Sequence, residues 1–419
     1  MRPSPSSDAI SLLGSDSSGR EGFLLSSPYC SFRTEGCQEV ITHPAIAGEQ
    51  RASTFQQQVN SAFARAKQAG ITRPILVGAI PFDTRQPSML FIPQRYHLLD
   101  RTDLQAASHR LLPPKTPSVL SVKALADAAD YQQAVACAVR DMKAGLLDKV
   151  VLGRQLVLET AQRPDAERLL ARLMTQNPDS YHFSVPLPQG TLLGASPELL
   201  LRKQGHQLWS TPLAGTARRS DDAEEDRLQA YALQHSLKDL HEHRVVTQAI
   251  RQRLTPIVQH LHIPSIPDVM PTTRLWHLGS SIRADIGDAH ETALTLACRL
   301  HPTPALRGFP EMAAAQRIAQ LEPEDRGPFG GIVGWCDDKG NGEWIVAIRC
   351  GIVSEQGLRL FAGAGIVADS DPASEWHETA NKLGTMLEAF GLDRDFIMSL
   401  SSVSQMPSPS TTRQEHHAS

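Results

Sequence analysis

Three charged residues near the carboxyl end of the chain are spaced as on one face of a helix. Glu375, Glu378 and Lys382 are separated by three and four positions, and a helix turns by about 100° per residue, so their side chains point the same way. Two carboxylates beside an ammonium group could hold a hard divalent cation together with an anionic substrate. The plainer alternative is a solvated Glu378–Lys382 ion pair, which stabilises a helix by roughly 0.3 kcal/mol.

Two further charged residues lie among apolar neighbours. Lys149 precedes Val150 and Val151 in a predicted strand, where a lysine partly removed from water could act as a general base or could extend its ammonium group to the surface. Glu198 lies in a turn before the apolar run LLLRK. Apolar surroundings raise the pKa of a carboxyl group, so Glu198 could serve as an acid, or it could pair with Arg202.

A fourth carboxylate and an arginine complete the set of candidates. Glu242 lies in a predicted helix and could be an oxygen ligand of Mg²⁺, or it could form an exposed ion pair with Lys238. His241 and His243 flank it, but they point to different sides of a helix and HExxH spacing is absent, so we exclude a zinc site. Arg349 lies in an apolar predicted strand, where its fork needs a carboxylate, from a substrate or from the protein.

Backbone turns and a helix start must position these side chains. The sequence predicts a strand at 360–362, a turn at Gly363 and Gly365, and a helix that begins at Asp371, because Asp caps a helix and Pro372 suits its first position. The segment STPLAGTARR predicts another turn, in which Gly215 permits close approach of the backbone to a ligand and Thr216 supplies a donor.

The remaining pattern predicts an α+β fold. Helices are expected at 54–69, 127–144 and 165–176, and one long helix at 223–254. A polar surface connection is expected at 102–121. Strands occur in runs without regular βαβ alternation, which favours large, mostly antiparallel sheets.

Composition excludes several classes of partner. The chain has 41 basic and 45 acidic residues and a net charge of −4, so we expect no nucleic-acid partner. No stretch reaches the ~18 apolar residues of a membrane span. The six cysteines form no CxxC pair, which excludes a common structural zinc motif and fits a reducing cytoplasm.

The domain limits follow from low complexity at both ends. Residues 1–21 and 399–419 are rich in Ser and Pro and are predicted to be disordered tails. Residues 22–398 are predicted to form one catalytic domain with its core at 125–395. The first 21 residues lack an apolar stretch, so no signal peptide is expected.

Several short stretches, taken together and in order, resemble the chorismate-utilising enzymes related to anthranilate synthase component I. They resemble most closely the isochorismate synthases of siderophore pathways. The likeness covers about residues 130–392, and VGAIPFDTRQPS extends it toward the amino end. It implies a chorismate-binding fold of two packed subdomains with a deep site between them. The stretches are LDKVVLGR, GASPELLLR, STPLAGTARR, HEHRVVTQA, WHLGSS, LHPTPALRGFP, FGGIVGWCD, AIRC and FAGAGIV with the helix that follows.

The resemblance also implies a role for each candidate. Lys149 matches the general base that activates water for attack at C2 of chorismate, and Glu198 matches the acid that protonates the departing C4 hydroxyl. Glu242 and Glu378 match ligands of Mg²⁺, with Glu375 supporting the ion through water. The residues implied to hold or flank chorismate are Gly215, Thr216, Ala305, Arg349, Gly363, Gly365 and Lys382.

The implied activity is that of a Mg²⁺-dependent isomerase, an isochorismate synthase serving 2,3-dihydroxybenzoate and catecholate siderophore biosynthesis. A menaquinone-pathway isochorismate synthase is one alternative. Another is a salicylate synthase, which would go on to eliminate pyruvate. The segment HLGSS resembles that class at Gly279 and Ser280, whereas Leu306 and Phe361 favour stopping at isochorismate.

Aminating relatives are disfavoured by two residues. Aminodeoxychorismate synthases carry a lysine where this chain has Ala214, and anthranilate synthases lack the lysine matched by Lys149. Water is therefore the expected nucleophile, and no glutaminase subunit is expected. We also expect a monomeric, cytoplasmic protein without a membrane partner. A catalytically silent chorismate-binding protein is disfavoured because the acids are retained.

Overall fold

The computed structural model describes residues 22–111, 118–288 and 290–392. Both predicted tails, and residues 393–398 of the predicted domain, lie outside the described residues. No helix in the described part of the chain is long and apolar enough to cross a membrane.

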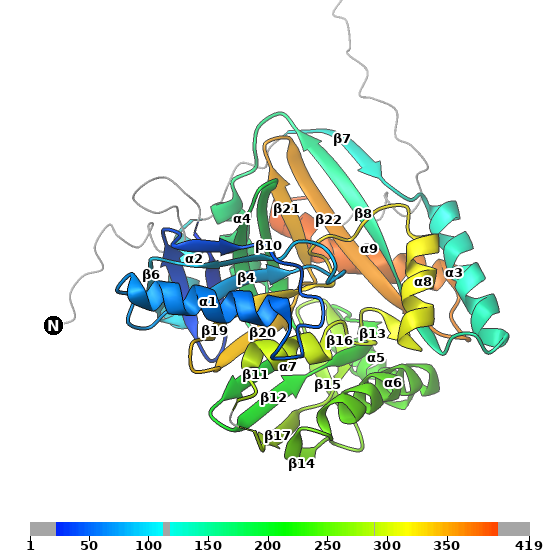
Figure 1. Ribbon diagram of the computed structural model, residues 1–419. Coiled ribbons are helices and arrows are strands. Elements are labelled where there is room, and N and C mark those ends of the chain that lie inside the picture. The colour runs from blue at the N-terminus through cyan, green and yellow to red at the C-terminus, as the bar shows by residue number, and fades with distance from the viewer. Residues whose placement is uncertain (1–21, 112–117, 289, 393–419) are drawn as a thin grey trace, which may run out of the picture.

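Two large sheets form the centre of the molecule (Figure 1). Their central strand pairs are antiparallel, which confirms the predicted α+β class. The ten-stranded sheet runs β18 (Gly308–Phe309), β8 (Lys149–Thr160), β22 (Gly357–Ile366), β21 (Cys350–Ser354), β10 (Gly190–Ser196), β9 (Tyr181–Leu187), β1 (Leu24–Ser26), β2 (Ser31–Glu35) and β6 (Arg95–Leu99), and β7 (Val119–Ala124) also pairs with β8.

The nine-stranded sheet and a small third sheet complete the strands. The nine-stranded sheet runs β14 (Val258–His262), β17 (Ile282–Ile286), β12 (Gln207–Thr211), β11 (Leu199–Gln204), β20 (Gly342–Val346), β19 (Ile332–Asp337), β4 (Ile75–Ile80), β5 (Met89–Ile92) and β3 (Glu39–Ile41). The small sheet consists of β13 (Leu213–Arg218), β16 (Leu275–Gly279) and β15 (Asp268–Pro271).

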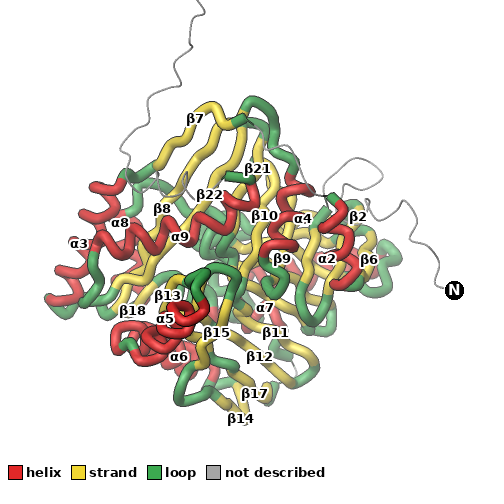
Figure 2. The backbone as a smooth tube through the Cα atoms, turned by 180° about the vertical axis from the view of Figure 1, so that it is seen from behind, coloured by secondary structure: helices red, strands yellow, loops and turns green. Residues whose placement is uncertain are grey.

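Helices cover the outer faces of the two large sheets (Figure 2). One apolar core fills the space between the inner faces of the sheets, with Phe183 and Ile352 from one sheet against Val333 and Ile345 from the other. A second core lies under α1, α6 and α7, and two more lie under α3, α4, α8 and α9. The helices are α1 (Thr54–Gln68), α2 (Arg101–Arg110), α3 (Ala128–Lys143), α4 (Ala166–Gln176), α5 (Ala223–His235), α6 (Leu237–Leu254), α7 (Ala293–Leu300), α8 (Glu311–Leu321) and α9 (Pro372–Phe390).

Two neighbouring strands pass from one large sheet to the other at the same place. The chain leaves β10 and enters β11 through residues 197–198, and it leaves β20 and enters β21 through residues 347–349. The two passages are joined by hydrogen bonds, from Val346 N to Glu198 O at 3.1 Å and from Ala195 N to Arg349 O at 3.1 Å. We call these two segments the double crossing. It brings Glu198 and Arg349, both candidate site residues, to the junction of the sheets.

The structure contradicts two predicted elements, the long helix at 223–254 and the strand around Arg349. The predicted long helix at 223–254 is two helices, because Ser236 has extended backbone angles and its side chain accepts from Asp239 N to cap α6. Arg349 does not lie within a strand, because β20 ends at Val346 and β21 begins at Cys350. Its φ of 50° is left-handed, a conformation that costs a non-glycine residue free energy.

The two predicted glycine turns are strands. Gly363 and Gly365 lie inside β22, opposite Gly153 and Val151 of β8. Gly215 lies inside β13, where its φ of 88° accompanies a register irregularity opposite β16. At Gly215 and Gly365, close contacts from neighbouring side chains, and not a reversal of the chain, leave little or no room for a Cβ atom.

The predicted polar connection at 102–121 is also wrong for the described residues. Most of its first half is α2, which Asp100 caps by accepting from Thr102 N and Asp103 N. Leu104 and Ala107 are buried, and Leu104 packs into a small apolar cluster with residues of α4. The start of α9 is confirmed, because Asp371 accepts from Ser374 N and Pro372 occupies the first turn.

Candidate active site

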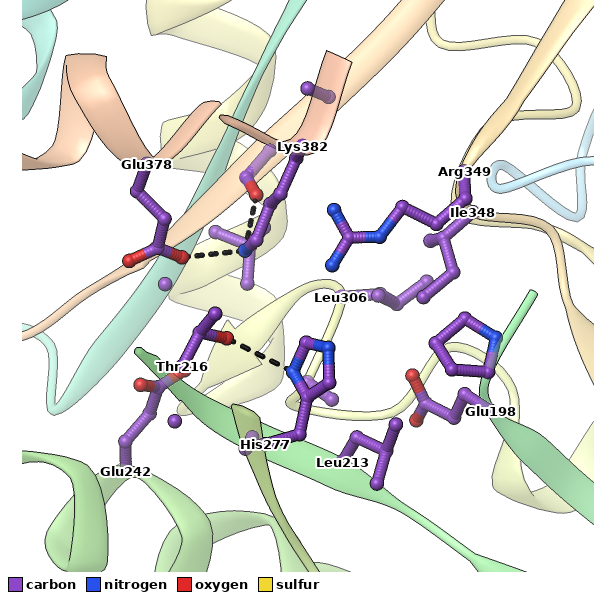
Figure 3. Close-up of a pocket in the computed structure, with 18 of the residues that line it drawn as sticks. Glu198, Leu213, Thr216, Glu242, His277, Leu306, Ile348, Arg349, Glu378 and Lys382 are labelled. Atoms are coloured by element: carbon purple, nitrogen blue, oxygen red, sulfur yellow. Dashed lines mark hydrogen bonds and ion pairs between the residues drawn. The ribbon is translucent and has the colours of Figure 1, made fainter. Parts of the chain in front are cut away.

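A cavity of about 670 Å³, part of it open to solvent, lies beside the double crossing, between β8 and β22 of the ten-stranded sheet and β13 and β16 of the small sheet. Ten of the twelve predicted site residues line it, whereas Lys149 and Glu375 do not. Figure 3 shows Glu242, Glu378 and Lys382 toward one side, Glu198 toward the other, and His277 between them. The ten residues are Glu198, Gly215, Thr216, Glu242, Ala305, Arg349, Gly363, Gly365, Glu378 and Lys382.

Glu198 is a buried carboxyl group on the double crossing. Its side chain is removed from water, which raises its pKa to about 7, although Leu213 N–H, Lys149, Lys382 and Arg349 act in the opposite direction. The alternative pairing with Arg202 is wrong, because that guanidinium stacks over the rings of Tyr29 and Trp209. A carboxyl group with this pKa can donate a proton near neutral pH.

Arg349 is a buried cation aimed into the cavity (Figure 3). Burial lowers the pKa of its guanidinium to about 10, yet the group stays charged near neutral pH. Its Nη1 has no hydrogen-bond partner among the described residues. A buried, partly unpaired guanidinium on a left-handed backbone is costly, so the arrangement suits an anionic ligand such as a carboxylate.

Lys149 lies just behind the cavity wall and is fully buried, which excludes the alternative of a surface lysine. Its Nζ lies 2.8 Å from Glu242 Oε1. Burial tends to raise the pKa of Glu242, but the attraction of Lys149 outweighs it and leaves that pKa below its usual value. Glu242 therefore faces the cavity as an ionised, buried carboxylate, and its predicted alternative pairing with Lys238 is not formed.

Gly365 allows the contact between Lys149 and Glu242. A Cβ atom at this position would lie 2.2 Å from Glu242 Oε1 and 3.1 Å from Lys149 Cε. At Gly363 the nearest atom to such a Cβ would be Leu152 O at 3.3 Å. Position 365 therefore requires a glycine because the Glu242 carboxylate approaches it so closely, whereas a Cβ atom at position 363 would make only a tight contact.

Lys382 and Glu378 form the predicted ion pair, at 2.5 Å between Nζ and Oε1. The pair lines the cavity and is mostly buried, so it is not the solvated pair of the plainer alternative. Lys382 Nζ also donates to Gly363 O at 2.9 Å. This second bond holds the ammonium group against β22, beside the space for a ligand.

Glu375 lies outside the cavity lining and binds Lys238 of α6, at 2.7 Å. Burial and then the charge of Glu378 raise the pKa of Glu375 to about 7. Asp239, which the sequence reasoning missed, has its pKa raised by burial and by Glu242 and Glu378. Negative charge is therefore crowded where α6 and α9 meet.

Among the described residues no group of three or more acidic, His or Cys side chains converges closely enough to hold a metal ion. The donor chemistry nevertheless suits Mg²⁺, which is often held by one or two carboxylates with substrate oxygens and water in its other positions. Glu242 and Glu378 supply two such carboxylates on one cavity. A divalent cation would also relieve the like-charge crowding that raises the pKa of Glu375 and Asp239.

His277 of β16 is a cavity residue to which the sequence reasoning gave no role. Its Nδ1 lies 3.2 Å from Thr216 Oγ1, its register neighbour in β13, and its Nε2 has no partner among the described residues. Burial, with Arg349 and Lys382 nearby, keeps its pKa well below the usual value, so the imidazole is neutral. Strand alternation with Thr216 was the signal that could have identified it.

The two histidines beside Glu242 have different surroundings. His243 is buried, and its Nε2 lies 2.8 Å from Ser280 Oγ, whereas His241 is exposed. The two rings therefore point to different sides of α6, as the spacing predicts. Ser280 is thus hydrogen-bonded to a histidine of α6 and does not line the cavity.

Apolar side chains form the rest of the cavity wall. Ala305 and Leu306 come from the loop before β18, and Phe329 stacks on Phe361 with ring centroids 5.5 Å apart. Ile348 belongs to the double crossing. The site therefore combines an apolar wall that suits a ring with the cations Arg349 and Lys382 and the carboxyl groups Glu198, Glu242 and Glu378. An apolar wall with a few convergent charged groups suits a small anionic ring compound.

Comparison with known proteins agrees with this chemistry. Residues 92–391 match the family described as chorismate binding enzyme. The isochorismate synthase EntC of Escherichia coli (strain K12) is 50% identical over 371 residues, which cover 88% of this chain and 95% of that protein. Two solved structures also align along most of their length.

The first solved structure is that of the 2,3-dihydroxybenzoate-specific isochorismate synthase DhbC from Bacillus anthracis. It aligns with a TM-score of 0.83 and 38% identity, over 92% of this chain and 100% of that chain. The second is MenF, the menaquinone-specific isochorismate synthase from Escherichia coli, with a TM-score of 0.76 and 26% identity over 92% of each chain.

Proposed function

The chain belongs to the family of chorismate binding enzymes, and from that premise we propose that it is an isochorismate synthase. The single observation that carries the proposal is that Glu198, whose pKa burial raises to about 7, lines a cavity behind whose wall the buried Lys149 lies. Displacement of a hydroxyl group by water needs an acid for the leaving oxygen and a base for the entering one. The reaction class is therefore an isomerisation.

The proposed reaction balances without any oxidant or reductant. Lys149, in its neutral amine form, takes a proton from water as the water oxygen bonds to C2 of chorismate. The ring double bonds shift, the bond between C4 and its hydroxyl oxygen breaks, and Glu198 protonates the departing oxygen. One water enters and one leaves, so substrate and product are isomers.

Two cations and a neutral histidine position the substrate in this proposal. Chorismate is a dicarboxylate, and Arg349 offers an unpaired Nη1 inside the cavity. Lys382 is held beside the same space by Gly363 O and Glu378. The neutral His277 faces the ring region with an unpaired Nε2.

Magnesium is proposed as the cofactor, held by Glu242 and Glu378. When bound, it would neutralise a substrate carboxylate that would otherwise lie beside those two acids. Removal of divalent cations with EDTA should abolish turnover, and added MgCl₂ should restore it. A chelated protein that retains full activity would contradict the cofactor assignment.

Product analysis tests the activity itself. Chromatography after incubation with chorismate and Mg²⁺ should show isochorismate as the main product. Salicylate with pyruvate as main products would favour the salicylate synthase alternative instead. Turnover that requires ammonia would favour an aminating enzyme.

The likeness to DhbC and EntC supports a role in 2,3-dihydroxybenzoate and catecholate siderophore biosynthesis. The likeness to MenF is weaker in sequence identity. We also propose that the enzyme acts without a glutaminase subunit, since water is the nucleophile, and as a monomer.

A further inference from the structure

One edge of the strand that carries Lys149 lacks a neighbouring strand where it passes the cavity. β18 pairs with β8 at Lys149 and Val150, and the last backbone bond on that side runs from Val151 N to Arg307 O at 3.0 Å. The next backbone bond along the edge runs from Leu125 N to Gln155 O at 3.1 Å. Between these two bonds, backbone groups of β8 need other partners.

Two side chains supply those partners. Arg326 Nη2 donates to Val151 O at 2.8 Å, and Gly153 N donates to Glu322 Oε1 at 2.7 Å. Arg326 and Glu322 are themselves ion-paired, with Arg326 Nε donating to Glu322 Oε2 at 2.8 Å. The Arg326 and Glu322 side chains are only 4% and 7% exposed. This buried ion pair therefore makes the hydrogen bonds to β8 that a neighbouring strand would otherwise make.

The same arginine also holds the apolar wall of the cavity. Its Nη1 donates to Leu306 O at 2.8 Å, and its backbone carbonyl accepts from Phe329 N at 3.0 Å. Its guanidinium lies 4.2 Å from the centre of the Phe82 ring. Val151, Leu306 and Phe329 all line the cavity, and Arg326 bonds to the backbone of each.

Gly153 shows how closely the pair is fitted to β8. A Cβ atom there would lie 3.3 Å from Phe329 Cε1, 3.4 Å from Glu322 Oε1 and 3.5 Å from Arg326 Nε. A larger residue would press on all three groups at once. Gly153 of β8, the Arg326–Glu322 ion pair and Phe329 are therefore tightly packed against one another, and we call this contact the seam.

We propose that Arg326, held by Glu322, is a positioning residue that fixes the spacing between Lys149 and the apolar wall formed by Leu306 and Phe329. The proposal rests on the function proposed above, because the wall and the lysine bound the space for the ring and the attacking water. Arg326 itself lies outside the cavity lining, so it acts through Val151, Leu306 and Phe329.

The test compares variants that keep bulk but remove different bonds. Arg326→Met keeps an apolar stem over Phe82 and loses every donor, and Arg326→Lys keeps one charged donor. Arg317→Met is the matched control, because Arg317 lies on α8 and pairs with Asp141 at 2.6 Å outside the cavity lining. All variants are assayed with chorismate and Mg²⁺ at a temperature well below their measured Tm, so that every variant is folded during the assay.

We expect kcat of Arg326→Met to fall at least about tenfold, because small misplacement of reacting groups is costly. KM should change less than about threefold, because Arg349 and Lys382, which hold the carboxylates, are untouched. Arg326→Lys should recover part of the lost kcat, and Arg317→Met should keep its kcat within about twofold. A purely structural role would lower the Tm of both Met variants without this split between kcat and KM.

Equal kcat values for wild type and Arg326→Met would overturn the proposal. Should Arg326→Met not fold, Gly153→Ala provides the second variant, since it displaces the same seam by a few tenths of an ångström. Amide hydrogen exchange gives a readout that needs no turnover. Faster exchange at Val151 and Gly153 in the folded variant supports the proposal, and unchanged exchange contradicts it. An inactive wild type would count against the proposed function alone.

Discussion

The two ends of the cavity hold the same side chain in opposite states. Glu198 and Glu242 are both glutamates and are only 2% and 9% exposed. Burial raises the pKa of Glu198 to about 7, whereas Lys149 at 2.8 Å brings the pKa of Glu242 below its usual value. Because both acids are buried, the difference between their pKa values comes from the lysine that contacts Glu242.

This difference divides the chemistry between the ends. At the end formed by the double crossing, a proton is retained for donation. At the end where α6 and α9 meet, Glu242 stays ionised because it lies against Lys149. The predictions that follow disturb one end at a time.

The largest effect is expected at the proton-donating end. Glu198→Gln should lower kcat about 1,000-fold, because the amide cannot donate the proton that the leaving hydroxyl needs. Substrate binding, followed by isothermal titration, should remain measurable because Arg349 and Lys382 are intact. A variant with a rate near wild type would show that Glu198 is not the acid.

Lys149→Ala should lower kcat by a factor of about 100 to 1,000, since the proposed base is lost. It should also bring the pKa values of Glu198 and Glu242 closer together, because Glu242 would then be buried without its lysine partner and its pKa should rise. The pKa of Glu242 can be followed by carbon-13 NMR on selectively labelled protein. Retention of the wild-type rate would contradict the role of Lys149.

The glycines of β22 give a smaller, graded effect. Gly365→Ala should lower kcat/KM at least about tenfold and raise the Mg²⁺ concentration needed for half-maximal activity, because its Cβ would displace the Glu242 carboxylate. Gly363→Ala is the matched control, with its nearest contact at 3.3 Å, and should lose less than about threefold. Equal losses in the two variants would argue against a specific role for the close approach.

The smallest effect is on stability, and its sign follows from the raised pKa of Glu198. Between pH 4.5 and about 7 the unfolded chain releases this proton while the native state keeps it, so stability falls as pH rises. Above pH 7 the loss is complete and amounts to on the order of 1–3 kcal/mol. Glu198→Gln should therefore be more stable than wild type at pH 8 in urea unfolding, but not at pH 4. Parallel curves at both pH values would refute this.

Much of the site was predictable because its residue types are unusual in their local setting. A glutamate before an apolar strand, a lysine inside one and acids at helical spacing all stand out in the sequence. Asp371 followed by Pro372 marks the start of α9 through purely local capping bonds. Such signals depend on neighbours in the chain and are therefore visible without the fold.

The rest depends on contacts between distant segments. An ion pair of Lys238 with Glu242 was one of two alternatives for these residues, but Lys238 reaches Glu375 on α9. His277 gains its role from the register of β16 against β13. The left-handed backbone of Arg349 follows from the passage between two sheets, and no local pattern marks it. The sequence predicts a turn at the glycines of β22, since glycine is common in turns. The actual reason for Gly365 is its contact with Glu242, which lies on α6, far away in the sequence.

The double crossing has a mechanical consequence. The chain passes directly between the two large sheets at the double crossing, through residues 197–198 and 347–349, and again where β2 leads into β3 and β5 leads into β6. Glu198 and Arg349 lie on the double crossing itself, whereas Glu242 and Glu378 lie on helices, α6 and α9. The acid end of the cavity is therefore held by backbone connections between the sheets, and the end with Glu242 and Glu378 is held by the packing of two helices.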